Sequence, residues 1–234
     1  MTDALTMPHQ TLRHLRGKHA HRGGTVDTAY WTIRDAIRTG VIAPGERLIE
    51  LDLAAALEMS RTPIREALHR LEVERLVENA PRRGLIVPVI TIDDLVEIFE
   101  IREVLEGLAA RRAAQRMSDA ERRALEATVV QMERAHATDD LTSLSAASTQ
   151  FHRLLRSGAK HARLPALIAL LSDSQRPLSA HEMAPERAGA AVAEHRAILE
   201  AIVSNDAALA ERLAREHSRH ALHAQILARH LSAD

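Results

Sequence analysis

The sequence predicts a mainly α-helical chain, in which a small N-terminal unit of helices and a two-stranded ribbon precedes an all-α antiparallel bundle. Aromatic residues make up only 2% of the 234 residues, so the core must consist of Leu, Ile, Val and Ala. Such a core favours packed helices over a β-sandwich. Apolar residues recur at helical spacing along most of the chain, and only two short stretches near residues 76–89 have strand character.

Composition excludes several classes of protein. The chain has no cysteine, which rules out disulfides and thiolate metal sites. The longest apolar run, LPALIALL at 164–171, is too short to cross a bilayer, and the N-terminus lacks the apolar segment of a secretory signal. We therefore expect a cytoplasmic protein that does not associate with membranes. The net charge is −1, so any affinity for DNA must come from the local placement of arginines.

The first 90 residues divide into an arm and a folded unit. Residues 1–25 are polar, rich in His and Arg, and predict a flexible N-terminal arm. Residues 26–90 form the folded unit. A first helix begins at Val26 and ends at Gly40, and Pro44-Gly45 occupies the centre of a type II turn. A short helix over 50–57 follows.

The segment SRTPIREALHRLE at 60–72 predicts a second helix close behind it. Thr62 is the expected N-cap and Pro63 the first helical residue, where its missing N–H costs nothing. The apolar residues Ile64, Leu68 and Leu71 then face the core, which leaves Arg61, Arg65 and His69 on the exposed face.

Two short strands, LVEN (76–79) and LIVPV (85–89), are joined by APRRG and complete the order of a winged helix-turn-helix. In such a unit the N-terminal residues of the second helix reach base edges, and Arg can bind guanine through two hydrogen bonds. Thr62 and the free N–H groups of the first turn can hold a phosphate. Arg82 and Arg83 at the tip of the ribbon can reach the backbone or the minor groove. The alternative is that Arg61 and Arg65 only pair with Glu58, Glu66 or Glu72 at the surface.

Residues 91–234 predict helices joined by short loops, which is typical of an antiparallel bundle. Thr91 with Asp94, and Ser118 with Glu121, have the spacing of N-terminal caps. Further helices are expected at about 119–136, 140–157 (closed by Gly158), 162–178, 186–203 and 206–231, the last capped by Asp206.

Three histidines lie on faces of three different helices in this bundle. His195 and His217 share their faces with apolar or small residues, and His152 shares its face with Ser148 and Leu155. A buried imidazole needs a partner, and a divalent metal (Zn, Ni, Fe or Mn) would satisfy all three. The alternative is three unrelated histidines, each bound to a carbonyl or a Glu. His220 or His223 could also take the place of His217.

The stretch from Ile33 to Val87, with PGERL, SRTPIREAL and the wing glycine Gly84, resembles the DNA-binding domain of the GntR family of bacterial transcription regulators. The resemblance covers about residues 26–90. It implies that Arg61, Thr62 and Arg65 contact operator DNA, with Arg47 and the wing as weaker candidates. One departure is visible, because LEMSRT carries Glu58 where the subfamily often has a glycine suited to a left-handed conformation.

The stretches DDLVEIFEIREVLEGLAARRAA, FHRLLRSG and EHRAILEAIVSNDAALAERLAREH resemble the effector-binding FCD domain of the FadR subfamily, over about residues 92–230. The resemblance implies a metal held at Ser148, His152, His195 and His217. The first position normally carries Asp, so Ser148 is at best a weak ligand and the site is more positive, which favours an anionic effector. Arg102, on a mostly apolar face, either binds an effector carboxylate or pairs with Glu106 or Glu103. Arg176 is a weaker effector candidate.

The sequence thus predicts a homodimeric transcription regulator, a repressor that binds a palindromic operator and responds to a small organic acid, with a divalent metal and no organic cofactor. Two alternatives stay open. One is a metal-dependent helical-bundle enzyme, which lacks supporting motifs such as HExxH. The other is a DNA-binding protein whose helical domain only dimerises.

Overall fold

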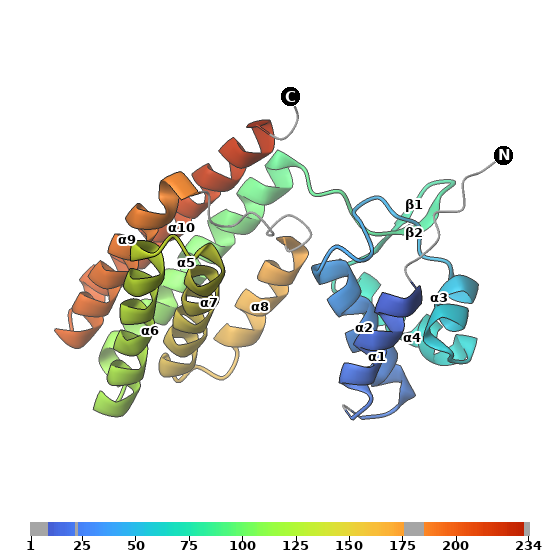
Figure 1. Ribbon diagram of the computed structural model, residues 1–234, viewed down its shortest axis with the longest axis horizontal. Helices are drawn as coiled ribbons and strands as arrows, with labels where there is room; N and C mark the ends of the chain where they lie inside the picture. The colour runs from blue at the N-terminus through green and yellow to red at the C-terminus, as the bar shows by residue number, and fades with distance from the viewer. Residues whose placement is uncertain (1–8, 22, 176–184, 232–234) are drawn as a thin grey trace. The chain divides into compact units, whose positions relative to one another are not determined.

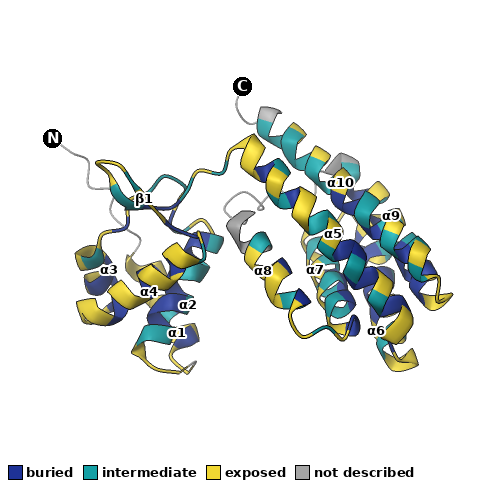
Figure 2. Cartoon of the chain, turned by 180° about the vertical axis from the view of Figure 1, so that it is seen from behind, coloured by how far each residue is buried: buried dark blue, intermediate teal, exposed yellow. Residues whose placement is uncertain are grey.

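The computed structural model describes residues 9–21, 23–175 and 185–231, which form helices and one two-stranded sheet (Figure 1). The chain divides into two compact units, and the main boundary falls between Ile90 and Thr91. The predicted fold class, a mainly helical chain with a winged helix-turn-helix followed by an all-α bundle, is confirmed. Figure 2 shows most helices buried on one side and exposed on the other, as an apolar stripe requires.

The first unit contains α1 (His9–His19), α2 (Thr25–Arg38), α3 (Glu50–Leu57), α4 (Arg61–Val73), β1 (Glu78–Ala80) and β2 (Gly84–Ile86). Its core is aliphatic and includes Ile33, Leu53, Leu57, Ile64 and Leu71, all fully buried. The turn predicted at Pro44-Gly45 is present, since Gly45 has φ +79° and the amide of Glu46 donates to the carbonyl of Ala43 over 3.1 Å.

The prediction of a flexible arm for residues 1–25 is wrong where α1 forms. Leu12 and Leu15 are buried in the same core as α2 and α3. The buried His19 reaches Asp35 of α2, with 2.8 Å between its Nε2 and a carboxylate oxygen. The apolar residues that anchor this helix are two leucines three positions apart. The residues around them are polar, so the sequence shows no clear apolar stripe. Residues 1–8 lie outside the described part.

The wing is paired more extensively than the sequence predicts. β1 and β2 are antiparallel, with Asn79 opposite Leu85. The segment before α3 joins them, because the amide of Leu48 donates to the carbonyl of Leu85 and Arg47 forms a bridge with Ile86. The first strand begins later than predicted because Leu76 and Val77 are buried in the core of the unit instead of pairing with β2.

The second unit contains α5 (Ile92–Arg116), α6 (Asp119–Ala137), α7 (Leu141–Gly158), α8 (Leu164–Gln175), α9 (Pro185–Val203) and α10 (Ala207–Leu231). The first and last helices, α5 and α10, pack along each other, while α6 packs against α7 and α9. Phe151, Leu125 and Met132 are among the largest fully buried side chains. None of the described helices combines the length and the hydropathy that a bilayer span requires.

Several caps in the second unit follow the sequence, with Gly158 as the exception. Both capping boxes, Thr91 with Asp94 and Ser118 with Glu121, are formed, and the Asp206 carboxylate accepts from the amide of Leu209 over 2.9 Å. Gly158 does not close α7 as predicted. It is the last helical residue and Ala159 is the C-cap; a Cβ on Gly158 would stand 2.5 Å from Met117 Cγ, so close packing explains the glycine.

Candidate functional site

The surface that the sequence assigns to DNA begins at the N-terminus of α4. The helix starts two residues earlier than predicted: Ser60 is the N-cap, with extended φ −69° and ψ 163°, and Arg61 is the first helical residue. Thr62 and Pro63 therefore occupy the second and third positions. Proline is tolerated there because the amides of the first helical turn have no partner within the helix.

Arg61 and Arg65 lie in the first two turns of α4 and both bind Glu50 at the start of α3. Arg65 donates from Nε and a terminal nitrogen to the two carboxylate oxygens of Glu50, each over 3.0 Å. Arg61 donates to one of these oxygens over 3.2 Å. Hydrogen bonds from Arg65 first, and then from Arg61, hold the pKa of Glu50 below its usual value. The predicted alternative partners Glu58, Glu66 and Glu72 are not the ones used, because Glu50 faces α4 across the helix-turn-helix.

Both guanidinium groups stay accessible in spite of this pairing. The side chains of Arg61 and Arg65 are 60% and 65% exposed. His69 lies one turn further along α4 and is also exposed, with its Nδ1 3.9 Å from a carboxylate oxygen of Glu72. Arg61, Arg65 and His69 are therefore all exposed, as the sequence predicts. Figure 2 shows that α4 has an exposed side.

The wing gathers three further arginines. Arg83 donates to the carbonyl of Gly45 over 2.9 Å, and Arg82 has a left-handed φ of +63° at the turn. Gly84, with φ +76°, lies against the guanidinium of Arg47, whose Nε would be 3.6 Å from an added Cβ. Arg47 and the wing residues are therefore one basic surface, although Arg47 is far from them in the sequence.

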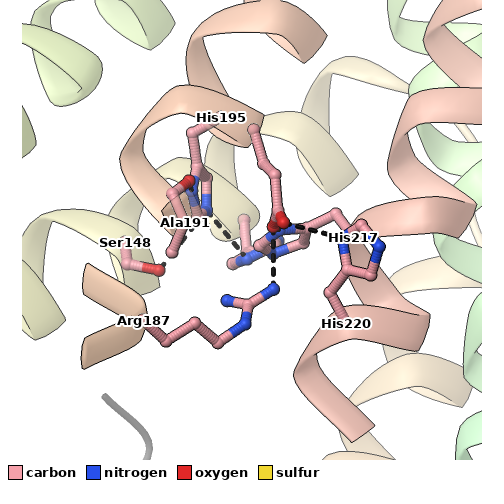
Figure 3. Close-up of polar contacts among 8 residues, drawn as sticks. Ser148, Arg187, Ala191, His195, His217 and His220 are labelled. Carbon is pink, nitrogen blue, oxygen red and sulfur yellow. Dashed lines mark hydrogen bonds and ion pairs between the residues drawn. The ribbon is translucent and has the colours of Figure 1, made fainter. Parts of the chain in front are cut away.

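In the second unit, His152 of α7, His195 of α9 and His217 of α10 meet as the sequence predicts. Their ligand atoms all lie within 4.8 Å of one another, and Nε2 of His152 is 3.3 Å from Nε2 of His195. Phe151 packs edge-on against His195 with ring centroids 4.7 Å apart, which closes one side of the cluster. Figure 3 shows His195 and His217 approaching each other from their separate helices.

Hydrogen bonds fix the tautomers of two of these rings. Nδ1 of His195 donates to the carbonyl of Ala191 over 2.6 Å, and Nδ1 of His217 donates to Glu194 over 2.6 Å (Figure 3). Each bond leaves Nε2 with a lone pair directed at the cluster. Glu194 also accepts from His220 over 2.7 Å and from Arg187 over 2.8 Å. Since His220 binds the outside of Glu194, His217 is the member of the cluster.

The pKa values of His152 and His195 favour neutral imidazoles. Burial, then the neighbouring His217, lowers the pKa of His195 to about 3. Burial also holds the pKa of His152 well below its ordinary value, helped by the adjacent histidines and by Arg156 and Arg102. Burial alone would raise the pKa of Glu194, but the hydrogen bond from His217 lowers it to about 2.

The donor set fits a divalent metal. Neutral imidazole nitrogens bind Zn, Ni, Fe and Mn, and two nitrogens about 3.3 Å apart match adjacent positions of a tetrahedral zinc. The outer Glu194 is the kind of carboxylate that orients a ligating histidine. Nδ1 of His152 is buried and has no hydrogen-bond partner in the structure, so this ring is less constrained than the other two. Ser148 Oγ lies 3.5 Å from His195 Nε2, at the position where a carboxylate would complete the set.

Positive groups surround the cluster. Arg156, one turn beyond His152, binds the buried Glu106 through its Nε over 3.2 Å and through a terminal nitrogen. Arg102 lies 3.8 Å from the same carboxylate and over the ring of Phe99. The structural pairing predicted as an alternative for Arg102 is thus present with Glu106, whereas Glu103 pairs with Arg219. Arg176 lies outside the described residues.

Sequence reasoning missed several residues of these sites. Glu50 was not recognised because its partners stand 11 and 15 residues away on another helix. Glu194 and Arg156 had a usable signal, since one adjoins His195 and the other follows His152 at helical spacing. Arg187 had none, because its role depends on a contact with Glu194.

A basic wing beside a helix with N-terminal arginines, followed by a helical domain, defines the class of winged helix-turn-helix regulators. The model of bacterial regulatory proteins of the gntR family matches residues 25–87, and the FCD domain model matches residues 97–220. The chain belongs to the gntR family of transcription regulators and carries an FCD domain. It is a DNA-binding regulator and not an enzyme.

Relatives and solved structures agree with this assignment. The chain is 39% identical over 155 residues to an HTH-type transcriptional regulator in the TAR-I ttuE-ttuC' intergenic region of Agrobacterium vitis, covering 62% of this chain and 87% of that protein. It is 32% identical over 184 residues to a probable D-xylose utilization operon transcriptional repressor of Paenarthrobacter nicotinovorans, covering 77% and 80%. The fold matches E. coli McbR/YncC with a TM-score of 0.72 and 22% identity, over 88% and 98% of the two chains.

Proposed function

We propose that this regulator is a homodimeric repressor whose operator binding is controlled by a small organic acid bound beside a divalent metal in the FCD domain. The observation that carries the proposal is the convergence of three histidine nitrogens, two of them with tautomers fixed by Ala191 and Glu194. A buried cluster of neutral imidazoles needs a cation or an elaborate hydrogen-bond network to be stable. Ala191 and Glu194 bind the Nδ1 atoms of His195 and His217, whereas the Nε2 atoms of His152 and His195 face each other 3.3 Å apart, a spacing that a shared cation would satisfy.

The effector class follows from the charges around the cluster. A divalent ion held by His152, His195 and His217 keeps its full charge, because Ser148 stands where a carboxylate would reduce it. Arg102 and Arg156 share one carboxylate, Glu106, so together they still add positive potential. A carboxylate of the effector would complete the coordination and compensate this charge. To change operator affinity, the effector must bind one arrangement of the two domains better than the other.

On the DNA side, Arg61, Thr62 and Arg65 at the start of α4 are the proposed contacts in the major groove. His69 extends this face, and Arg47, Arg82, Arg83 and Gly84 form the wing that contacts the backbone or minor groove. Homodimerisation is supported by apolar side chains left exposed on α5, among them Ile101 and Val104, at 53% and 49% exposure. Two copies related by a two-fold axis would match a palindromic operator.

The metal prediction is tested by elemental analysis of the purified protein. We expect about one divalent ion per chain, lost in His195→Ala, because removal of one of three ligands exposes the site to competition by water. His223→Ala is a matched control, since His223 lies on α10 outside the cluster. A native protein that holds no metal and still responds to its effector would refute the proposal.

The DNA contact is tested by Arg65→Ala in a binding titration. If Arg65 reads a base, the operator affinity should fall by about 1–3 kcal/mol, and discrimination at one base pair should relax. Arg75→Ala, in the loop that follows α4, is the control for loss of charge alone. Unchanged affinity and specificity in Arg65→Ala would remove this residue from the interface.

A further inference from the structure

Glu58, in the turn between α3 and α4, has a backbone conformation that is unfavourable for a residue with a side chain. Glu58 has φ 51° and ψ 48°, the left-handed region that a glycine adopts freely. The amide of Met59 donates to the carbonyl of Ala54 over 3.0 Å, the pattern that closes a helix on a left-handed residue. Because only Met59 separates Glu58 from the N-cap Ser60, the conformation of Glu58 sets the direction in which α4 begins.

Helix α1 reaches this turn from outside the segment that matches the gntR model. Arg13 Nε lies 3.4 Å from one carboxylate oxygen of Glu58, and a terminal nitrogen of Arg16 lies 3.2 Å from the other. Arg16 also donates to the carbonyl of Leu57, the last residue of α3. The buried Leu12 and Leu15 anchor α1 on the core, so the two arginines are presented from a fixed helix.

The charge of Glu58 matters because of its location. The free amides at the start of α4 form the place where a DNA phosphate is expected to bind. A carboxylate two residues before the N-cap would repel that phosphate. Arg13 and Arg16 surround this carboxylate with two positive charges, and they also restrain the side chain of a residue whose backbone is strained.

From these contacts we propose that Arg13 and Arg16 are positioning residues for DNA binding, which hold Glu58 and the α3–α4 turn in the form that receives the operator. The proposal rests on the operator interface proposed above. Helix α1 therefore contributes to DNA binding through the α3–α4 turn. Glu58, held by the two arginines, keeps the left-handed backbone conformation that a glycine would adopt without help.

A double-mutant cycle tests the coupling in the full-length protein. Four proteins are compared: the parent, Arg13→Ala/Arg16→Ala, Glu58→Gly, and the triple variant. The probe is the duplex that the parent enriches most strongly from a randomised library, and each protein is also unfolded thermally without DNA. We expect the arginine variant to bind this duplex about threefold to tenfold more weakly in the Glu58 background. In the Glu58→Gly background the same change should have little effect.

The alternatives give different results. If the arginines contact phosphates directly, or if α1 only adds to the core, the loss will be equal in both backgrounds and the proposal is overturned. Absence of loss in both backgrounds overturns it as well. Lys18→Ala removes a charge from the same helix and should show no coupling to Glu58. If the parent enriches no duplex, the operator interface itself is wrong, while the unfolding temperatures still report whether α1 and the turn are coupled.

Discussion

Glu50 of α3 is the carboxylate that connects the two arginines at the start of α4. It binds Arg61 and Arg65 at the same time, so the two guanidinium groups are already ordered before the proposed contact with DNA. Ordering a free arginine side chain costs up to about 2 kcal/mol, and preorganisation removes part of this cost from the binding step. The same carboxylate lowers the attraction of this face for any phosphate backbone.

Replacement of Glu50 by Gln is therefore expected to reduce specificity. The amide keeps the shape of the side chain but loses its charge. The affinity for non-specific duplexes should therefore rise more than the affinity for the operator. The ratio of operator to non-specific affinity should fall by about threefold or more. Titrations of both duplexes at several salt concentrations measure this ratio. Asp52→Asn is the control in the same helix, and an unchanged or higher ratio in Glu50→Gln would contradict the prediction.

At this scale the sequence predicts residues well where a helix face decides their environment. The apolar neighbours of His195 placed it in the core, and it is 1% exposed. Spacing could not show that Glu50 binds Arg65, or that Arg187 binds Glu194, because these contacts join helices that only the tertiary fold brings together. Helix α1 was not predicted for a related reason, because the burial of Leu12 and Leu15 depends on packing against α2 and α3, which only the tertiary fold brings together.

Among the elements, α6 is tied at its first turn by a cap with a shifted pKa. Lys160, which follows α7, donates a hydrogen bond to Glu121, and the amide and hydroxyl of Ser118 donate two more. These bonds, that from Lys160 first, lower the pKa of Glu121 to about 2 from 4.5. The cap thus joins the start of α6 to the end of α7.

This cap makes the stability of the bundle depend on pH. The folded pKa is lower than the unfolded one, so the contribution of Glu121 is complete above about pH 4.5 and is lost as the pH falls towards 2. Glu121→Gln should therefore be less stable than the parent at neutral pH, and should lose less stability between neutral pH and about pH 3. Urea unfolding at a series of pH values measures this. Glu126→Gln, which removes an exposed carboxyl from the same helix, is the matched control.

Element boundaries show where local signals suffice. The capping boxes at Thr91 and Ser118 were predicted from spacing alone, because the groups that satisfy each helix end lie within four residues. The start of α4 was misplaced because Thr62-Pro63 is also a good beginning, and the choice of Ser60 depends on how the preceding turn is held. Gly158 resembles a stop signal, but the packing of Met117 accounts for it.

For the molecule as a whole, the family, the fold and the class of function follow from the sequence. The charge of the proposed metal site depends on a single residue, Ser148. Three histidines without an acidic ligand leave an ion with its full charge and an open coordination position. An effector that carries a carboxylate would then act as ligand and counter-charge together. In the proposed function, the preference for an anionic effector is therefore attributed to Ser148.

Ser148→Asp tests this directly. The new carboxylate would supply the missing anionic ligand, so we expect the metal affinity to rise by about tenfold or more, measured by competition with a chelator. The same carboxylate would occupy the position proposed for the effector. In a thermal-shift panel of sugar acids, hydroxy acids and dicarboxylates, the compound that stabilises the parent should stabilise Ser148→Asp much less. Ser148→Ala removes only the hydroxyl and should keep the response. If Ser148→Asp binds metal more tightly but responds to the anion as the parent does, the effector binds away from the metal, and Arg102 with Arg156 becomes the place to search for its carboxylate.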